Sequence, residues 1–258
     1  MTNTEIRGVI FDYGGTLDTR GDHWSEVIWD GYRQCSVDVD KQDYRNAYVY
    51  GERALAANPI VTPEFHFIDV LREKIKLQLQ FLAGLPLLPT GKDDEEKQAQ
   101  LSAHMSAGNV SEIEATAMRI AQCINDTTNA LLTENRQVLE RLRQAGLPMV
   151  LVSNFYGNIK TVLRDAHLDG FFKDIIESAV VGVRKPNPAI FALGVCSLDL
   201  PASQVVVVGD TYTKDIVPAH KLGCHTIWIK GRQWEDKPAD ESVCDAVITR
   251  LDEMLKLL

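Results

Sequence analysis

The chain has 258 residues, of which 45% are hydrophobic and 24% charged, a composition typical of a globular protein that buries a sizeable core. Its 27 basic and 36 acidic side chains leave a net charge of −9, which argues against general binding to nucleic acid because the phosphate backbone repels an acidic surface. No apolar stretch reaches the length of a membrane span and no leader-like segment opens the chain, so we expect a cytoplasmic protein with no membrane partner.

The first predicted element is a short buried strand that ends in an acid. An apolar run at residues 9–11 leads directly into Asp12, and Gly14 and Gly15 follow as signals of a tight turn. Such a strand would place Asp12 at the carboxyl edge of a parallel sheet. Open α/β sheets bind their ligands at that edge.

Helical patterns dominate the next hundred residues. Apolar side chains recur there at helical spacing, and β-branched apolar runs are rare. Thr62 followed by Pro63 is typical of a helix start. The predicted helices cover residues 23–36, 41–57, 62–82, 93–100 and 110–132.

Short apolar strands that alternate with helical segments occupy the rest of the chain. An amphipathic helix is predicted over residues 136–145, ended by Gly146. The predicted strands are residues 149–152, 175–180, 205–208, 226–229 and 246–248. This alternation predicts an α/β fold with a doubly wound parallel sheet. The sheet domain is therefore split: residues 1–18 and 134–258 form the core, and residues 19–133 form an inserted α-helical domain.

Side chains that could take part in catalysis or ligand binding lie at the ends of four predicted strands or in the loops that follow them. Taken singly, a Ser after a strand, a Lys before a Pro or an Asp after a Gly is usually a turn, cap or surface residue. All of them in this order are hard to obtain by accident. They are Asp12, Ser153 with Asn154, Lys185 in the segment KPNPA, and Asp210 with Asp215 in the segment VVVVGDTYTKD.

These four segments together resemble the sequence motifs of the haloacid dehalogenase-like hydrolase superfamily. The resemblance implies a Rossmann-like core with an inserted α-helical cap, and an enzyme that uses Mg²⁺. It implies that Asp12 is both nucleophile and metal ligand, with the Gly14 main-chain carbonyl and Asp210 as further ligands. Asp215 would lie beside the metal, orienting a bound water or pairing with Lys185. Ser153, Asn154 and Lys185 would bind the substrate phosphate, and Ser153 and Lys185 would act in catalysis.

The implied reaction is hydrolysis of a small phosphorylated metabolite through an aspartyl-phosphate at Asp12. Phosphoryl transfer needs an in-line nucleophile and positive partners that spread the negative charge. A lid made by the insertion would exclude water from the site. We expect a monomer or homodimer, with candidate lid contacts at Trp24, Trp29, Arg33, Tyr44, Arg45, Tyr48 and Arg53.

One position departs from the family pattern. The family's phosphatases carry a second Asp two residues after the first, as general acid and base, whereas this chain has Gly14. Three explanations remain open. Another group, His23 or Asp18 in the same loop, supplies the proton; the substrate has a good leaving group such as an acyl phosphate, phosphonate or halide; or turnover is lost and the protein binds a phosphometabolite.

Two alternative chemistries follow from the same departure, because 2-haloacid dehalogenases and phosphonatases of the family also lack the second Asp. The dehalogenases work without metal and lack the first acid of the fourth motif, whereas this chain has Asp210. A phosphonatase needs a cap lysine that forms a Schiff base, for which Lys41, Lys74 and Lys76 are available.

Overall fold

The computed structural model describes residues 5–90, 110–234 and 240–258. The chain divides into two compact units, one formed by Met1–Glu26 with Thr128–Leu258 and the other by Val27–Thr127. Within the described residues, no helix combines the length and the apolar character needed to cross a membrane.

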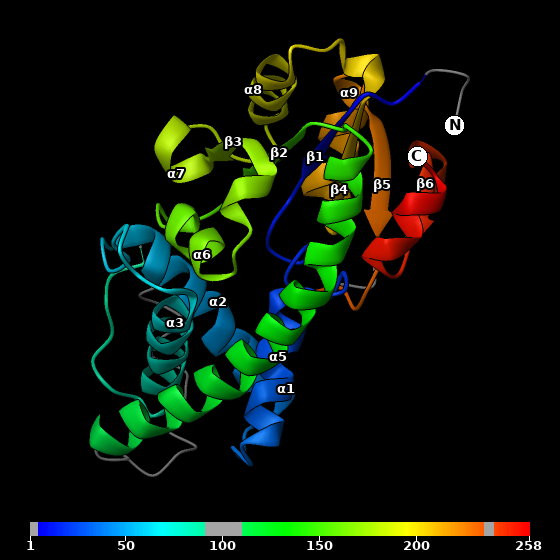
Figure 1. Ribbon diagram of the computed structural model, residues 1–258. Helices are drawn as coiled ribbons and strands as arrows, with labels where there is room; N and C mark the ends of the chain where they lie inside the picture. Colours follow the sequence, from blue (N-terminus) through cyan, green and yellow to red (C-terminus); the bar gives the residue numbers. More distant parts are fainter. Residues whose placement is uncertain (1–4, 91–109, 235–239) are drawn as a thin grey trace. The chain divides into compact units, whose positions relative to one another are not determined.

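The first unit contains a parallel sheet, which in the described part of the chain has six strands (Figure 1). The sheet has the strand order β3-β2-β1-β4-β5-β6. The strands are β1 (Gly8–Phe11), β2 (Met149–Ser153), β3 (Phe172–Glu177), β4 (Val205–Gly209), β5 (His225–Ile229) and β6 (Ala246–Ile248). The predicted doubly wound parallel sheet, divided between the N-terminal strand and the second half of the chain, is confirmed.

The strand β1 lies at the centre of this sheet, and Phe11 at its end is in register with Leu151 of β2 and Val208 of β4. The chain adds β2 and β3 on one side of β1 and then crosses to add β4, β5 and β6 on the other. The order of the strands therefore reverses next to β1. In open α/β sheets this switch point leaves a crevice at the carboxyl ends of the strands.

Apolar side chains bury the central strands on both faces. Every residue of β1, β2, β4 and β5 is buried, as expected when helices cover both faces of a parallel sheet. One core cluster joins Ile10, Val150 and Val207 to Phe191 of helix α8 (Ala189–Leu198). The buried core therefore supports the strand that leads directly into Asp12.

Short helices complete the first unit. They are α6 (Ile159–Asp165), α7 (Ser178–Val181), α8 and α9 (Val217–Lys221). Helix α6 begins where the buried carboxylate of Glu177 accepts hydrogen bonds from the backbone amides of Gly157 (2.6 Å) and Ile159 (3.3 Å). These bonds satisfy donors that a helix start leaves without partners.

The second unit contains helices, in agreement with the predicted insertion. The helices are most of α1 (Trp24–Gln34), α2 (Lys41–Ala57), α3 (Phe67–Leu82) and the first part of α5 (Val110–Gln144). Helix α2 begins as predicted, because the side chain of Asp40 accepts hydrogen bonds from the amides of Gln42 and Asp43.

Three predicted boundaries are corrected by the structure. Helix α3 begins at Phe67 and not at Thr62, because His66 and Asp69 form a capping box at that point. Residues 110–132 and 136–145 are one continuous helix, since neither Gly nor Pro interrupts α5. The third strand spans Phe172–Glu177, and residues 178–181 are helical instead of extended. The helix predicted at residues 93–100 lies outside the described residues.

Candidate active site

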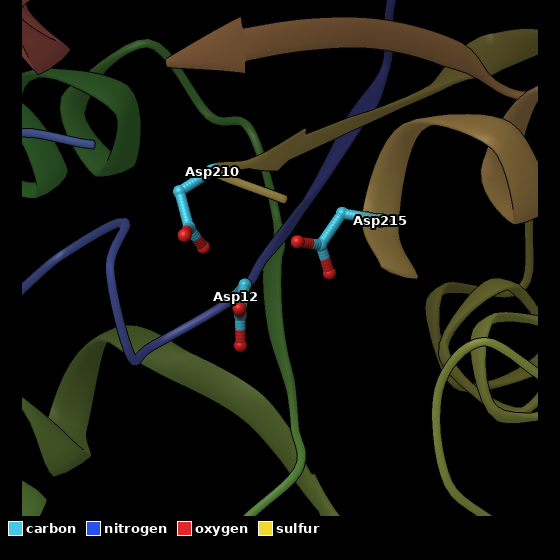
Figure 2. Close-up of side chains that lie close together, drawn as sticks. All are labelled: Asp12, Asp210 and Asp215. Atoms are coloured by element: carbon cyan, nitrogen blue, oxygen red, sulfur yellow. The ribbon is translucent and has the colours of Figure 1, made fainter. Parts of the chain in front are cut away.

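Three predicted acids meet at the carboxyl edge of the sheet. Asp12 follows β1, Asp210 follows β4, and Asp215 lies in a π-helical turn (Tyr212–Ile216) that leads into α9. Figure 2 shows the three side chains lying close together. One ligand oxygen from each lies within 4.8 Å of the others, and all three residues are buried.

Glycines allow these acids to approach one another so closely. A Cβ on Gly15, whose φ is +96°, would lie 2.3 Å from Cγ of Asp210, and a Cβ on Gly209 would lie 2.3 Å from Cβ of Asp215. Both distances are far below van der Waals contact. The GG and GD pairs of the sequence are therefore packing requirements of the acidic cluster as well as turn signals.

Neighbouring hydroxyls and amides orient the carboxylates. The hydroxyls of Thr16 and Thr211 donate to the two carboxylate oxygens of Asp210, at 3.4 and 3.1 Å. The amide of Thr211 donates to Asp215 Oδ2 at 3.0 Å. The amide of Tyr13 lies 2.7 Å from Oδ1 of Asp12 and donates to it. Each acid is therefore held in one orientation before any ligand arrives.

Lys185 forms ion pairs with two of the three acids. Its Nζ lies 2.8 Å from Oδ1 of Asp12 and 2.7 Å from Oδ1 of Asp215, and the residue is only 3% exposed. The lysine precedes α8 in the chain, so its charge comes from a different loop than either acid. A buried ammonium between carboxylates supplies one positive charge against three potential negative charges.

The electrostatic balance of the cluster favours an additional cation. Burial raises the pKa of Asp12 to about 6, although Lys185 acts to lower it. Burial, together with the charges of Asp215 and Asp12, raises the pKa of Asp210 well above its usual range. Burial disfavours charge on Lys185, but Asp12 and Asp215 outweigh it and raise the pKa of the lysine. A divalent cation among the carboxylates would favour their ionised forms.

The donor set fits Mg²⁺ by its chemistry. Carboxylate oxygens of Asp12 and Asp210 are hard ligands, Asp215 lies beside them, and the carbonyl of Gly14 belongs to the turn that follows Asp12. Among the described residues, no histidine or cysteine joins this cluster, so a softer metal such as zinc is not favoured.

Ser153 and Asn154 lie at the end of the neighbouring strand β2. Ser153 is the last residue of β2 and is buried. The Asn154 side chain contacts the backbone of Lys185 in both directions: Nδ2 donates to its carbonyl at 3.1 Å, and its amide donates to Oδ1 at 2.9 Å. The side chain predicted to bind phosphate thus holds the loop that carries the lysine.

The two candidate substitutes for the missing acid lie in the loop after β1 and at the start of α1. The carboxylate of Asp18 accepts hydrogen bonds from the amide of Gly15 (2.6 Å) and from Nε1 of Trp24 (3.2 Å). Burial raises the pKa of Asp18 to about 8. His23 precedes α1, and its Nδ1 accepts a hydrogen bond from the amide of Ser25 at 3.2 Å. Such a bond is typical of a helix cap.

Some contributors to the site were missed by sequence reasoning. Nε1 of Trp228, the penultimate residue of β5, donates a 2.7 Å hydrogen bond to the backbone carbonyl of Asp210. Thr16 and Thr211, whose hydroxyls donate to the Asp210 carboxylate, were also missed. The threonines lie within the quoted motifs and could have been found there, but only the pairing of β4 with β5 brings Trp228 to this carbonyl.

Known proteins are similar to this chain in sequence and in fold. A model of the family described as "Hydrolase: haloacid dehalogenase-like hydrolase" matches residues 6–223. The chain is 31% identical to glyceraldehyde 3-phosphate phosphatase of Pyrococcus abyssi over 126 residues, 48% of this chain and 52% of that protein. It is 30% identical to (S)-2-haloacid dehalogenase 2 of Pseudomonas sp. over 141 residues, 54% of this chain and 61% of that protein.

The similarity in structure extends over more of the chain. The magnesium-bound HAD-hydrolase YfnB of Bacillus subtilis has a TM-score of 0.56 at 18% identity, covering 98% of this chain and 99% of that one. At this identity the likeness concerns the fold alone. The chain spans about half the length of the curated relatives it matches first.

Proposed function

The chain belongs to the haloacid dehalogenase-like hydrolases, and from this premise we propose that it is a Mg²⁺-dependent phosphatase that acts on a small phosphorylated molecule through an aspartyl-phosphate on Asp12. The observation that carries the proposal is the buried cluster of Asp12, Asp210 and Asp215 with Lys185 between two of them. A carbon–halogen hydrolase, whose nucleophile attacks carbon, needs only one carboxylate. Three buried carboxylates fit a site that holds a divalent cation against a phosphoryl group.

The chain's own residues support each part of this reaction. Asp12 lies at the end of a rigid strand with one oxygen held by the Tyr13 amide and by Lys185. Its oxygen would attack phosphorus and form the acyl phosphate. Lys185 would neutralise a phosphoryl oxygen and favour ionised Asp12, and Ser153 would donate a hydrogen bond to the phosphoryl group.

Asp12, Asp210 and the Gly14 carbonyl would hold Mg²⁺, with Asp215 orienting a water bound to it. Bound there, the ion would supply positive charge that offsets the repulsion among the carboxylates and the phosphate. Thr16 and Thr211 would keep the Asp210 carboxylate in a fixed orientation. A preorganised ligand set of this kind needs little rearrangement when the cation binds.

The domain boundaries belong to the same proposal. We infer that residues 19–133 are a cap domain and that residues 1–18 and 134–258 are the catalytic core. The compactness of residues 27–127 as a separate helical unit supports this division. A cap of this size would close over a small substrate and exclude water from the reaction.

The test is phosphate release from a panel of small phosphate esters and acyl phosphates, with and without Mg²⁺, with Asp12→Asn as the control. Turnover that requires both Mg²⁺ and Asp12 would support the phosphatase. Halide release from 2-haloacids without Mg²⁺ would instead indicate the carbon–halogen hydrolase. Trapping of a substrate on lysine by borohydride would indicate a phosphonatase, and ligand binding without product would indicate a phosphometabolite-binding protein.

A further inference from the structure

Position 14 lies two residues after Asp12 and has no side chain. A Cβ placed there would lie 3.6 Å from Nε1 of Trp24 and 3.7 Å from its Cδ1. The indole edge of Trp24 therefore borders the space that a side chain at position 14 would enter. An indole N–H donates hydrogen bonds, but it does not transfer a proton at neutral pH.

Asp18 and His23, the two candidate substitutes for the missing acid, are engaged as hydrogen-bond acceptors. Both oxygens of Asp18 accept N–H groups, one from Gly15 and the other from Trp24. Nδ1 of His23 accepts the amide of Ser25 at the start of α1. Lys185 is held between Asp12 and Asp215. These contacts hold the three side chains against the protein's own backbone and side chains.

We propose that the site acts on acyl phosphates, the mixed anhydrides of a carboxylic acid and phosphoric acid, and that Gly14 is the residue which sets this preference. The inference rests on the proposed phosphatase function of Asp12 and specifies its substrate class. The preference follows from the chemistry of the leaving group. An acyl phosphate releases a carboxylate, a weak base that departs without a proton, whereas an alkyl phosphate ester releases an alkoxide, which requires a general acid in the same step.

The atoms balance in both steps. In the first, an Asp12 oxygen forms a bond to phosphorus, the bond from phosphorus to the substrate's carboxyl oxygen breaks, and the carboxylate leaves with the electron pair. In the second, a water oxygen forms a bond to phosphorus and the Asp12 carboxylate leaves with its electron pair. One proton of the water remains on the released phosphate and the other passes to solvent.

The second step has no carboxylate base at position 14 to deprotonate the attacking water. We therefore expect hydrolysis of the aspartyl-phosphate to be slower than its formation. A rapid burst of the first product, close to one equivalent per site, should then precede the steady state. The burst provides a readout that does not depend on the steady-state rate.

The decisive experiment measures kcat/KM with Mg²⁺ for 2,4-dinitrophenyl phosphate, acetyl phosphate, phenyl phosphate and glycerol phosphate, whose leaving groups become progressively more basic. We expect a steep fall across this series in the unaltered protein. Gly14→Asp should restore the acid and base, and Gly14→Asn is its matched control of the same shape without a transferable proton. The surroundings accept the Cβ of either variant, since the nearest atoms to it would be at van der Waals distance.

The expected result is a change in the ratio of kcat/KM values for two substrates. The kcat/KM for glycerol phosphate relative to acetyl phosphate should be about 10²–10⁴-fold higher in Gly14→Asp than in Gly14→Asn, the contribution typical of general acid–base catalysis. The burst should shrink in Gly14→Asp and persist in Gly14→Asn.

Two results would overturn the inference while leaving the phosphatase intact. One is a shallow dependence on the leaving group in the unaltered protein, which would reveal another acid; loss of that shallow dependence in Asp18→Asn would identify it. The other is an equal ratio in both Gly14 variants when circular dichroism shows both to be folded. If either variant fails to fold, the dependence of kcat/KM on the basicity of the leaving group in the unaltered protein is by itself the test of the inference. Asp12-independent or undetectable phosphate release from every substrate would refute the proposed phosphatase and this inference together.

Discussion

The indole of Trp228 donates a 2.7 Å hydrogen bond from Nε1 to the backbone carbonyl of Asp210. Trp228 is 3% exposed and belongs to β5, whereas Asp210 directly follows β4, so the bond ties two adjacent strands together at the acidic cluster. It holds the backbone from which the Asp210 carboxylate extends. A residue with no contact to the substrate would in this way position a metal ligand.

Replacement of Trp228 by Phe should weaken Mg²⁺ binding. The variant keeps an aromatic ring in the core but leaves the buried carbonyl of Asp210 without this donor. A typical buried hydrogen bond contributes about 1 kcal/mol, which corresponds to an about fivefold rise in the Mg²⁺ concentration at half-maximal activity. Titration of phosphatase activity with Mg²⁺ at saturating substrate measures the effect.

Tyr212→Phe is the matched control for this variant. The Tyr212 ring packs against Trp228, with centroids 5.5 Å apart, but its hydroxyl donates to the carbonyl of Asp240 and not to Asp210. Its Mg²⁺ requirement should stay close to that of the unaltered protein. Equal Mg²⁺ dependence in all three proteins would show that the Trp228 bond does not position the ligand.

Mg²⁺ should stabilise the protein more at pH 8 than at pH 5. Burial raises the pKa of Asp12 to about 6 and that of Asp210 well above its usual range, so folding without metal favours the protonated form of both acids relative to the unfolded chain. The stability that this protonation provides is complete below pH of about 4, the unfolded value, and is lost as the pH rises through the folded pKa values. Mg²⁺ binds the ionised carboxylates and offsets that loss.

Thermal unfolding with and without Mg²⁺ at the two pH values measures this effect. At a concentration of about 100 times Kd the ion should add about 2.7 kcal/mol at pH 8. In Asp210→Asn the Mg²⁺ effect should disappear, because the variant lacks one of the carboxylates that would bind the ion. A Mg²⁺ shift that is the same at both pH values would contradict the expected coupling to protonation.

Alanine should be tolerated at position 14 and not at position 15. A Cβ at Gly14 has its nearest neighbour at 3.6 Å, but a Cβ at Gly15 would lie 2.3 Å from Cγ of Asp210 on a backbone with φ of +96°. The left-handed conformation alone costs about 1–2 kcal/mol for a residue with a side chain, and the overlap adds to it. Denaturant unfolding should therefore show a loss of more than about 2 kcal/mol for Gly15→Ala and a small change for Gly14→Ala. Similar losses in both variants would contradict the packing of Asp210 against Gly15.

Glu177→Ala should destabilise the loop that follows Ser153. The Glu177 carboxylate is 3% exposed and accepts two amides at the start of α6, which the truncation would leave buried without these partners. The expected loss is about 1–3 kcal/mol of unfolding free energy. Glu177→Gln retains an oxygen acceptor of the same reach and should lose less. The order of the two variants in denaturant unfolding decides whether these hydrogen bonds matter.

Residue order alone was enough to predict the parallel sheet and the acids at its edge. A buried strand ending in Asp12 and a second one ending in Gly209 and Asp210 can be recognised locally, because hydrophobic runs and glycine turns are short-range patterns. The elements that were misplaced depend on choices with nearly equal local preferences. Thr62 and Phe67 both offer acceptable helix starts, and the capping box formed by His66 and Asp69 favours the second.

The roles of individual side chains required the tertiary structure. Asn154 follows a strand as a phosphate-binding residue would, yet its side chain holds the backbone of Lys185, 31 residues away in the chain. Trp228 reads as an ordinary apolar strand residue until β5 pairs with β4. The local sequence thus determined which groups are available at the carboxyl edge. Folding decided which of them meet, because hydrogen bonds and ion pairs form between atoms that are near in space and distant along the chain.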